Sequence, residues 1–348
     1  LYNIVSWGAD FSFRELVDMY RDGDLTKPLL QRNYIWTILE ASRFIDSILL
    51  GLPVPSIFLA KQQDEKMLIV DGYQRIMTVH DFMEGKFANN KPFKLSQSDN
   101  INVRWRGKTF VELSNIEQRK IKTTTIHSII FQQKEPKDDT GMYQIFERIN
   151  TGGKALNAQE IRNCVYAGNF NELLIELNQH TTWRKILNKD MPYARMEDME
   201  LILRFFGISF IKKEAEVNSA SITLVKYLNE FMQRHKNLDN IGQTFKEIFI
   251  SSIDMLYAKL GKYTFRQINK GKPSPKIHPA ILDAVGASTI FIMSENVAIP
   301  ADLLSRYKTL VADEIFKKAI TQHTTEVCAI KTRINLATKI LYGVDYEW

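Results

Sequence analysis

The stretch MLIVDGYQRIMTVHDF, residues 67–82, limits what this chain can fold into more than any other part of its sequence. Four apolar residues, Met67 to Val70, are followed by the polar pair Asp71 and Gly72. Beyond Arg75, apolar side chains recur at the spacing of one helix face. The stretch therefore predicts a strand, a sharp polar turn and a helix in immediate succession.

Similar signals run through the first half of the chain and predict an α+β domain. Strands are expected within PSIFLAKQ, KMLIVDG and TIHSIIFQQ, with a hairpin turn at Asp64 and Glu65 between the first two. Helices are expected over 12–22, 37–50 and 73–84, each ended by a glycine. Residues 86–113 are irregular, with a hairpin expected through VRWRGKTFVEL. A later helix begins at Asn157, with Glu160 in the position of a capping box.

From Ala167 onward the periodicity is almost wholly helical. Segments with a helical period are 170–178, 197–212, 222–235, 241–260, 278–294, 301–319 and 325–342. We therefore expect two domains, an α+β domain over residues 1–165 and an all-helical domain over residues 166–348.

Composition narrows the class of protein. The 348 residues include only two cysteines, Cys164 and Cys328, which are far apart, and this favours a reducing compartment and argues against a structural zinc site. Neither a run of eighteen apolar residues nor a secretory signal pattern is present, so a cytoplasmic protein without membrane spans is expected. The net charge of +6 permits a polyanionic partner, but it also fits a mildly basic protein without one.

The turn after Val70 has the residue types of a phosphate site. Gly72 allows backbone N–H groups to approach a ligand closely, and the following helix directs its positive end to the same point. Arg75 adds a forked cation, and Asp71 can hold magnesium or orient water. Gln74 can donate to a phosphate or position a water molecule. The alternative is a plain turn, in which Asp71 caps the helix and Arg75 is solvated.

Two further polar clusters carry similar residue types. QRNYIW places Gln31, Arg32, Tyr34 and Trp36 in an otherwise apolar loop, where Arg32 is either a second phosphate or base contact or is stacked on aromatic rings. FERINTGGKALNAQEIR supplies Arg148, Asn150, Gly152, Gly153 and Arg162. Its glycine pair also fits an ordinary turn between two helices.

In order and spacing, the blocks QRNYIW, FIDSILLGLPVPSIFL, VDGYQR and FERINTGGKALNAQEIRN resemble the ParB/sulfiredoxin-like DGQQR domain. That domain forms the N-terminal half of GmrSD-type, modification-dependent restriction proteins and of related phage-defence proteins. The resemblance covers about residues 10–170, and RMEDMELILRFFGI is similar to the start of the helical region in these proteins. It implies a domain that binds and hydrolyses a nucleoside triphosphate, GTP or ATP with Mg²⁺, coupled to the recognition of modified DNA.

The resemblance also assigns roles to residues. The family motif falls on residues 71–75, where Tyr73 stands in place of the usual glutamine. Asp71, Gln74 and Arg75 are then expected to be catalytic, with Asp71 as the metal ligand. The residues expected to bind the cofactor are Gln31, Arg32, Tyr34, Gly72, Tyr73, Arg148, Asn150, Gly152 and Gly153.

Many members of that family carry a C-terminal HNH nuclease, which needs clustered histidines. His278, in KIHPAI, has no second histidine beside it, so we expect that the chain either lacks the HNH nuclease or has been cut before it, and that it can act with a separate nuclease subunit. The stretch 259–276 is basic and free of acids, and its Lys262, Arg266, Lys270 and Lys272 are expected to contact DNA. A solvated, flexible loop between helices is the alternative for this stretch.

Two functions remain open from the sequence. One is a nucleoside triphosphatase sensor of a restriction or phage-defence system, which engages DNA through its helical domain and can form a homo-oligomer. The other is a non-catalytic ParB-like module that binds DNA or a partner. The intact Gly72 and Arg75 favour the first function, and Tyr73 favours the second. Cleavage of DNA by the N-terminal domain itself is disfavoured, because no cluster of carboxylates accompanies Asp71.

Overall fold

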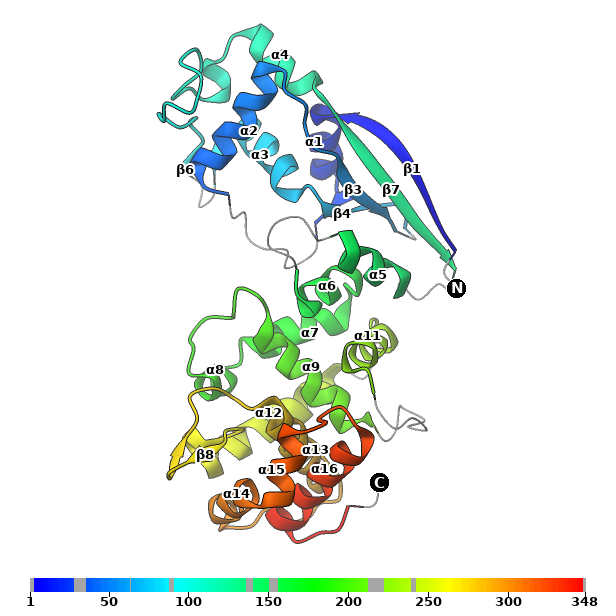
Figure 1. The fold of residues 1–348 in the computed structure, drawn as a ribbon, viewed down its shortest axis with the longest axis vertical. Helices are drawn as coiled ribbons and strands as arrows, with labels where there is room; N and C mark the ends of the chain where they lie inside the picture. Colours follow the sequence, from blue (N-terminus) through cyan, green and yellow to red (C-terminus); the bar gives the residue numbers. More distant parts are fainter. Residues whose placement is uncertain are drawn as a thin grey trace. The chain divides into compact units, whose positions relative to one another are not determined.

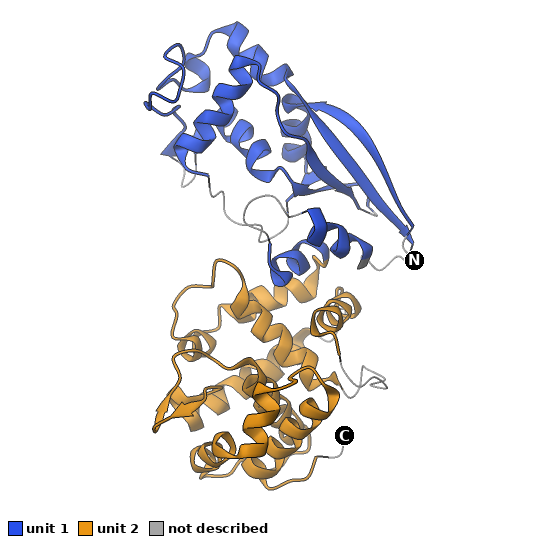
Figure 2. Cartoon of the chain, in the orientation of Figure 1, with its two compact units in different colours: residues 1–165 blue, residues 166–348 orange. Residues whose placement is uncertain are grey.

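The computed structural model describes residues 3–27, 36–62, 64–87, 91–135, 140–149, 156–211, 222–238 and 242–346. The chain divides into two compact units, Leu1–Val165 and Tyr166–Trp348, which Figure 2 shows in different colours. Strands and helices together make this a mixed α/β protein. Among the described residues, no helix combines the length and the apolar character that crossing a bilayer requires.

A five-stranded sheet forms the framework of the first unit (Figure 1). Its strands are β1 (Asn3–Ser12), β2 (Leu25–Thr26), β3 (Ile57–Lys61), β4 (Met67–Asp71) and β7 (Thr125–Glu135), in the spatial order β1-β7-β3-β4-β2. β1 pairs antiparallel with β7, and β3 lies parallel to β7 on its other side. β3 and β4 pair antiparallel, which confirms the predicted hairpin, and β2 is parallel to β4.

Helices of the first unit pack against this sheet and against one another. They are α1 (Phe13–Asp22), α2 (Ile38–Leu50), α3 (Tyr73–Glu84), α4 (Asn115–Thr123), α5 (Thr140–Ile149) and α6 (Ala158–Val165). The predicted helix ends are confirmed, because Ser12 forms a capping box at α1, and Gly23 and Gly51 end α1 and α2 with positive φ. The apolar faces of α1, α2 and α3 meet the strands in one core, which includes Phe13, Ile45, Ile57, Ile69 and Phe82.

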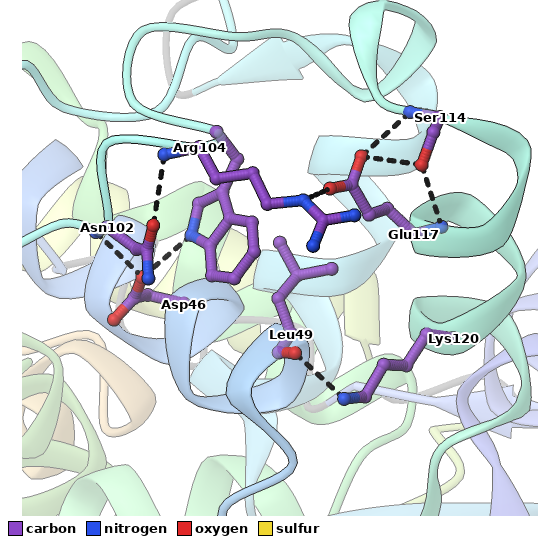
Figure 3. Close-up of polar contacts among 8 residues, drawn as sticks. Asp46, Leu49, Asn102, Arg104, Ser114, Glu117 and Lys120 are labelled. Carbon is purple, nitrogen blue, oxygen red and sulfur yellow. Dashed lines mark hydrogen bonds and ion pairs between the residues drawn. The ribbon is translucent and has the colours of Figure 1, made fainter.

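The segment between α3 and α4 differs from the prediction. It contains the short strands β5 (Lys86–Phe87) and β6 (Lys91–Pro92) and the 3-10 helix η2 (Phe110–Glu112), but no strand within residues 103–113. The hairpin predicted through VRWRGKTFVEL is therefore wrong. Trp105 Nε1 and the backbone N of Asn102 both donate to Oδ1 of Asp46 on α2, at 2.7 and 3.0 Å (Figure 3). These two hydrogen bonds to α2 hold the segment in its irregular path.

The described residues of the second unit form helices and one short hairpin. Its helices are α7 (Asn169–Asn178), α8 (Thr181–Leu187), α9 (Glu197–Ser209), α11 (Leu224–Arg234), α12 (Gly242–Leu260), α13 (Pro279–Ser294), α14 (Leu303–Ala312), α15 (Glu314–Thr321) and α16 (Val327–Tyr342). The predicted helix 301–319 is divided at Asp313, whose side chain accepts from the backbone N of Phe316 at 2.8 Å. Strands β8 (Ile268–Asn269) and β9 (Lys272–Pro273) form the hairpin, so the prediction of a wholly helical domain is wrong at this point.

A buried ionic cluster connects three helices of the second unit. Asp283 on α13 is fully buried. It accepts from Nη2 of Arg204 on α9 at 2.7 Å and from Nη2 of Arg333 on α16 at 3.0 Å. Because these residues are 79 and 50 positions from Asp283 in the sequence, the cluster fixes the mutual packing of the helices rather than any single helix.

Candidate functional site

Gly72 lies where strand β4 ends and helix α3 begins. Its φ of 99° and ψ of 4° belong to the left-handed region, which a residue with a side chain adopts only with strain. A Cβ atom at this position would lie 2.2 Å from Cγ2 of Ile57 on β3. The structure therefore requires glycine here for its backbone conformation and for the close packing of the hairpin, independently of any ligand.

The two charged residues of the turn form an ion pair. A terminal nitrogen of Arg75, Nη2, donates to Oδ2 of Asp71, and Nη1 makes a longer contact of 3.4 Å with the carbonyl of Pro55. The Arg75 side chain is 14% exposed, whereas that of Asp71 is 43% exposed. The structure differs from the plain-turn alternative in detail, because Asp71 pairs with Arg75 and the Arg75 side chain is largely buried rather than solvated, and this ion pair also suits a purely structural turn.

Gln74 connects the turn to the end of the QRNYIW block. Its side-chain Oε1 accepts from the backbone N of Trp36 at 3.3 Å. The Trp36 ring in turn packs edge-on against Phe44 of α2, with the ring centroids 5.6 Å apart. Two blocks that are far apart in the sequence therefore meet at the start of α3. Gln31, Arg32 and Tyr34 of this block lie outside the described residues.

Tyr73 is turned away from the exposed side of the turn. It is buried in the core of the first unit. Burial raises the pKa of its phenol to about 12, with smaller contributions from Tyr20 on α1 and Asp81 on α3. The prediction that Tyr73 contacts a bound nucleotide is contradicted by this burial, because the ring has little surface left for a ligand.

The third block is only partly described. Arg148 lies exposed in the last turn of α5, and no described contact joins it to the turn at residues 71–75. Asn150, Gly152 and Gly153 lie outside the described residues. The predicted capping box is confirmed, because the backbone N of Glu160 donates to Oδ1 of Asn157 at 2.9 Å and the Glu160 carboxylate accepts from the backbone N of Asn157 at 2.7 Å.

A comparison with known protein families identifies the family of the first unit. Residues 13–167 match the family described as the GmrSD restriction endonuclease, N-terminal domain. This part of the chain is a GmrSD-type N-terminal domain. The match includes all four sequence blocks, so the GmrSD prediction is confirmed, whereas the ParB/sulfiredoxin-like detail stays a prediction. No curated protein matches the chain.

The basic stretch of the second unit is an ordered structure and not a loose loop. It comprises the 3-10 helix η3 (Gly261–Tyr263) and the β8–β9 hairpin. Arg266 is only 6% exposed, and it donates to the carbonyls of Ile186 at 2.9 Å and Ser274 at 3.0 Å. Desolvation lowers the pKa of its guanidinium. Arg266 therefore holds the hairpin against α8, and the prediction that it contacts DNA is wrong.

Lysines surround Tyr263 on the same surface. Lys262, Lys270 and Lys272 are exposed. The ammonium groups of Lys262 and of Lys308 on α14 lie 5.7 and 5.4 Å from the centroid of the Tyr263 ring. The sequence reasoning missed Lys308, since it is distant in the chain and only the packing of α14 on β8 places it there.

Asp71 is the candidate ligand for magnesium at the turn. Among the described residues, no three side chains of His, Cys, Asp or Glu gather as a metal site. Magnesium, however, is commonly held by one or two carboxylates together with substrate phosphates. The half-exposed carboxylate of Asp71 fits that mode of binding. His278, at the N-terminus of α13, is half-buried, and burial lowers its pKa.

Proposed function

We propose that the turn at Asp71–Arg75 binds the phosphates of a nucleoside triphosphate, GTP or ATP, in a modification-dependent restriction or phage-defence system. One observation carries the proposal. The hydrogen bond from the backbone N of Trp36 to Gln74 holds the described end of the QRNYIW block at the start of α3, the helix whose first turn also carries Arg75. The guanidinium of Arg75 and the positive end of α3 at one point favour a phosphate group.

The ion pair between Arg75 and Asp71 suggests how the site would respond to a nucleotide. Without ligand, each charge satisfies the other. A triphosphate offers Arg75 a stronger, bidentate partner, and the exchange releases the carboxylate of Asp71. That carboxylate would then hold Mg²⁺, which neutralises part of the phosphate charge when it is bound. Asp71 and Arg75 thus act as a pair that opens when a metal nucleotide binds.

Removal of the arginine tests the phosphate site. Loss of one charged hydrogen-bond donor should cost roughly 1.5–3 kcal/mol of binding free energy, so Arg75→Ala should weaken nucleotide affinity by about ten- to a hundredfold. Arg21→Ala is the matched control, because Arg21 also forms carboxylate pairs in the first unit. Calorimetry with GTP and ATP in magnesium measures the affinity. Unchanged affinity in a variant with a native circular dichroism spectrum would rule out this site.

Asp71→Asn tests whether the carboxylate acts in turnover. The amide cannot hold Mg²⁺ as the carboxylate does, and it also releases Arg75 from its ion pair. Phosphate release should therefore fall far more than nucleotide affinity measured in magnesium. In EDTA, the affinity should be unchanged or higher than that of the parent. Equal losses of turnover and affinity would show that Asp71 only supports the turn.

A second candidate function, DNA binding without turnover, is favoured by the lysines around Tyr263 and by the burial of Tyr73. Phosphate contacts from Lys262, Lys270 and Lys272 would be independent of DNA sequence. Their joint replacement by alanine should flatten the slope of log affinity against log salt by about two to three units. The control replaces three lysines that are paired with carboxylates, Lys246, Lys317 and Lys339. Equal slopes in both variants would place any DNA contact elsewhere.

Nucleotide hydrolysis at the turn and DNA binding at the lysines are compatible, and either function can also exist without the other. If the lysine variant binds DNA weakly but hydrolyses nucleotide normally without DNA, the turn and the lysine surface are independent parts of one sensor. If the purified chain binds DNA but neither GTP nor ATP, the binding module is the correct function. The nuclease activity of such a system is expected from a separate subunit.

A further inference from the structure

Strand β1 forms one edge of the five-stranded sheet. It pairs with β7 on one side, and among the described residues no strand pairs with its other side. It is ten residues long, and the side chains of Val5 and Trp7 are 43% and 38% exposed. The strand precedes residue 13, where the family match begins. A long edge strand with exposed apolar side chains and little charge is a template for pairing with another strand.

The register with β7 identifies the backbone groups that face outward. The backbone N of Phe13 donates to the carbonyl of Thr124 at 3.1 Å, just beyond the last paired residues. In an antiparallel ladder, every second residue exchanges hydrogen bonds with the neighbouring strand. The odd-numbered residues of β1 therefore bond to β7. The residues that direct N–H and C=O groups to the open edge are Ile4, Ser6, Gly8 and Asp10.

We propose that this edge pairs with β1 of a second copy of the chain, antiparallel and around a two-fold axis at Trp7. Outward-facing residues must pair with one another, so Ser6 lies opposite Gly8 and Ile4 lies opposite Asp10 of the second copy. Trp7 then lies opposite the same residue of the second copy, as a pair without backbone hydrogen bonds, where side chains come closest.

The residues of β1 fit a second copy of themselves. Val5, Trp7, Ala9 and Phe11 alternate along one face, and Ala9 and Phe11 already pack against the core. Pairing across the axis extends this apolar face into the second copy and buries the exposed Trp7. The strand carries one charge, on Asp10, which faces Ile4 of the second copy, so no like charges oppose each other.

Neighbouring registers are less favourable. A two-fold axis at Gly8 would place Ile4 opposite Ser12, but the backbone N of Ser12 already donates to Oε2 of Glu15 at 2.7 Å. An axis at Ser6 would place Asp10 beyond the described part of β1 in the second copy, so the described ladder would be shorter. Among the described residues of β1, only the axis at Trp7 pairs all four outward residues with one another.

A charge exchange at the axis tests the interface and its register together. The intact chain should sediment as a dimer at micromolar concentration. Trp7→Glu and Trp7→Lys should each be monomeric, because like charges then face each other, whereas their mixture should form a heterodimer. Circular dichroism melts confirm that each variant is folded. A monomeric parent chain, a dimer that persists in Trp7→Glu, or a mixture that stays monomeric would each overturn the proposal.

Cysteine cross-linking also tests the interface, and it detects a dimer that is too weak to persist during sedimentation. In a Cys328→Ser background, Trp7→Cys should form an intermolecular disulfide under mild oxidation, because facing residues of such a pair have Cα atoms about 4.5 Å apart. Val5→Cys is the matched control, since the two copies of residue 5 would be roughly 13 Å apart along the strands. Cross-linking of Val5→Cys at the rate of Trp7→Cys would contradict the register.

Discussion

Replacement of Gly72 by alanine separates a structural glycine from a functional one. The left-handed backbone should cost a residue with a side chain about 1–2 kcal/mol. The contact of its Cβ with Cγ2 of Ile57, at 2.2 Å, adds an overpacking cost of about 1–3 kcal/mol. Gly72→Ala should therefore lower the free energy of unfolding by about 2–5 kcal/mol.

Gly85, at the other end of the same helix, is the matched control. It also has a positive φ, of 70°, but a Cβ there meets nothing within 4 Å. Gly85→Ala should therefore lose only the backbone term of about 1–2 kcal/mol. Urea unfolding of both variants measures the difference, and Ile57→Ala combined with Gly72→Ala should show a favourable coupling energy. If the two glycine variants unfold at the same urea concentration, the contact with Ile57 is not the reason for this glycine.

Three other predictions concern buried polar groups. Arg266→Ala should destabilise the second unit by about 2–5 kcal/mol in urea unfolding, because it leaves buried carbonyls without a donor, whereas Lys272→Ala should change stability by less than about 0.5 kcal/mol. Asp283→Asn should lower the free energy of unfolding by about 3–5 kcal/mol, because it leaves the positive charges of Arg204 and Arg333 buried without the carboxylate of Asp283. This loss should not depend on salt concentration, and a loss that added salt removes would contradict the explanation. In the folded protein Tyr73 should stay protonated to about pH 12, whereas in the unfolded chain its phenol loses the proton near pH 10. The free energy of unfolding should therefore fall as the pH rises from about 10 to about 12. In Tyr73→Phe this fall should be less steep.

Local signals in the sequence predicted local structure well. The N-cap at Ser12, the glycines that end α1, α2 and α3, and the β3–β4 hairpin all depend on residues within a few positions of one another. The family of the first unit was also predictable, because it rests on several blocks in a fixed order. These features need no knowledge of what packs against them.

Features decided by tertiary contacts could not be predicted in this way. The sequence pattern placed Trp105 in a strand, but its ring N–H donates a hydrogen bond to the buried carboxylate of Asp46 on α2. Arg266 looked like a DNA contact because its neighbours are lysines, and only the three-dimensional structure places the carbonyl of Ile186 beside it. No sequence pattern around Lys308 indicated that its ammonium group lies beside the Tyr263 ring. A periodicity pattern describes one segment and cannot report which distant atom will meet it.

The ion pair between Asp71 and Arg75 has a consequence for the speed of association. Because the two charges nearly cancel, the turn projects little field beyond one Debye length, about 8 Å at physiological ionic strength. A free nucleotide should therefore reach it by unassisted diffusion, with an association rate that depends only weakly on salt. The lysines around Tyr263 have no such cancellation among the described ion pairs, and they should attract a polyanion from a distance. The two surfaces should thus differ in kinetics, with faster, strongly salt-dependent association at the lysines and slower, weakly salt-dependent association at the turn.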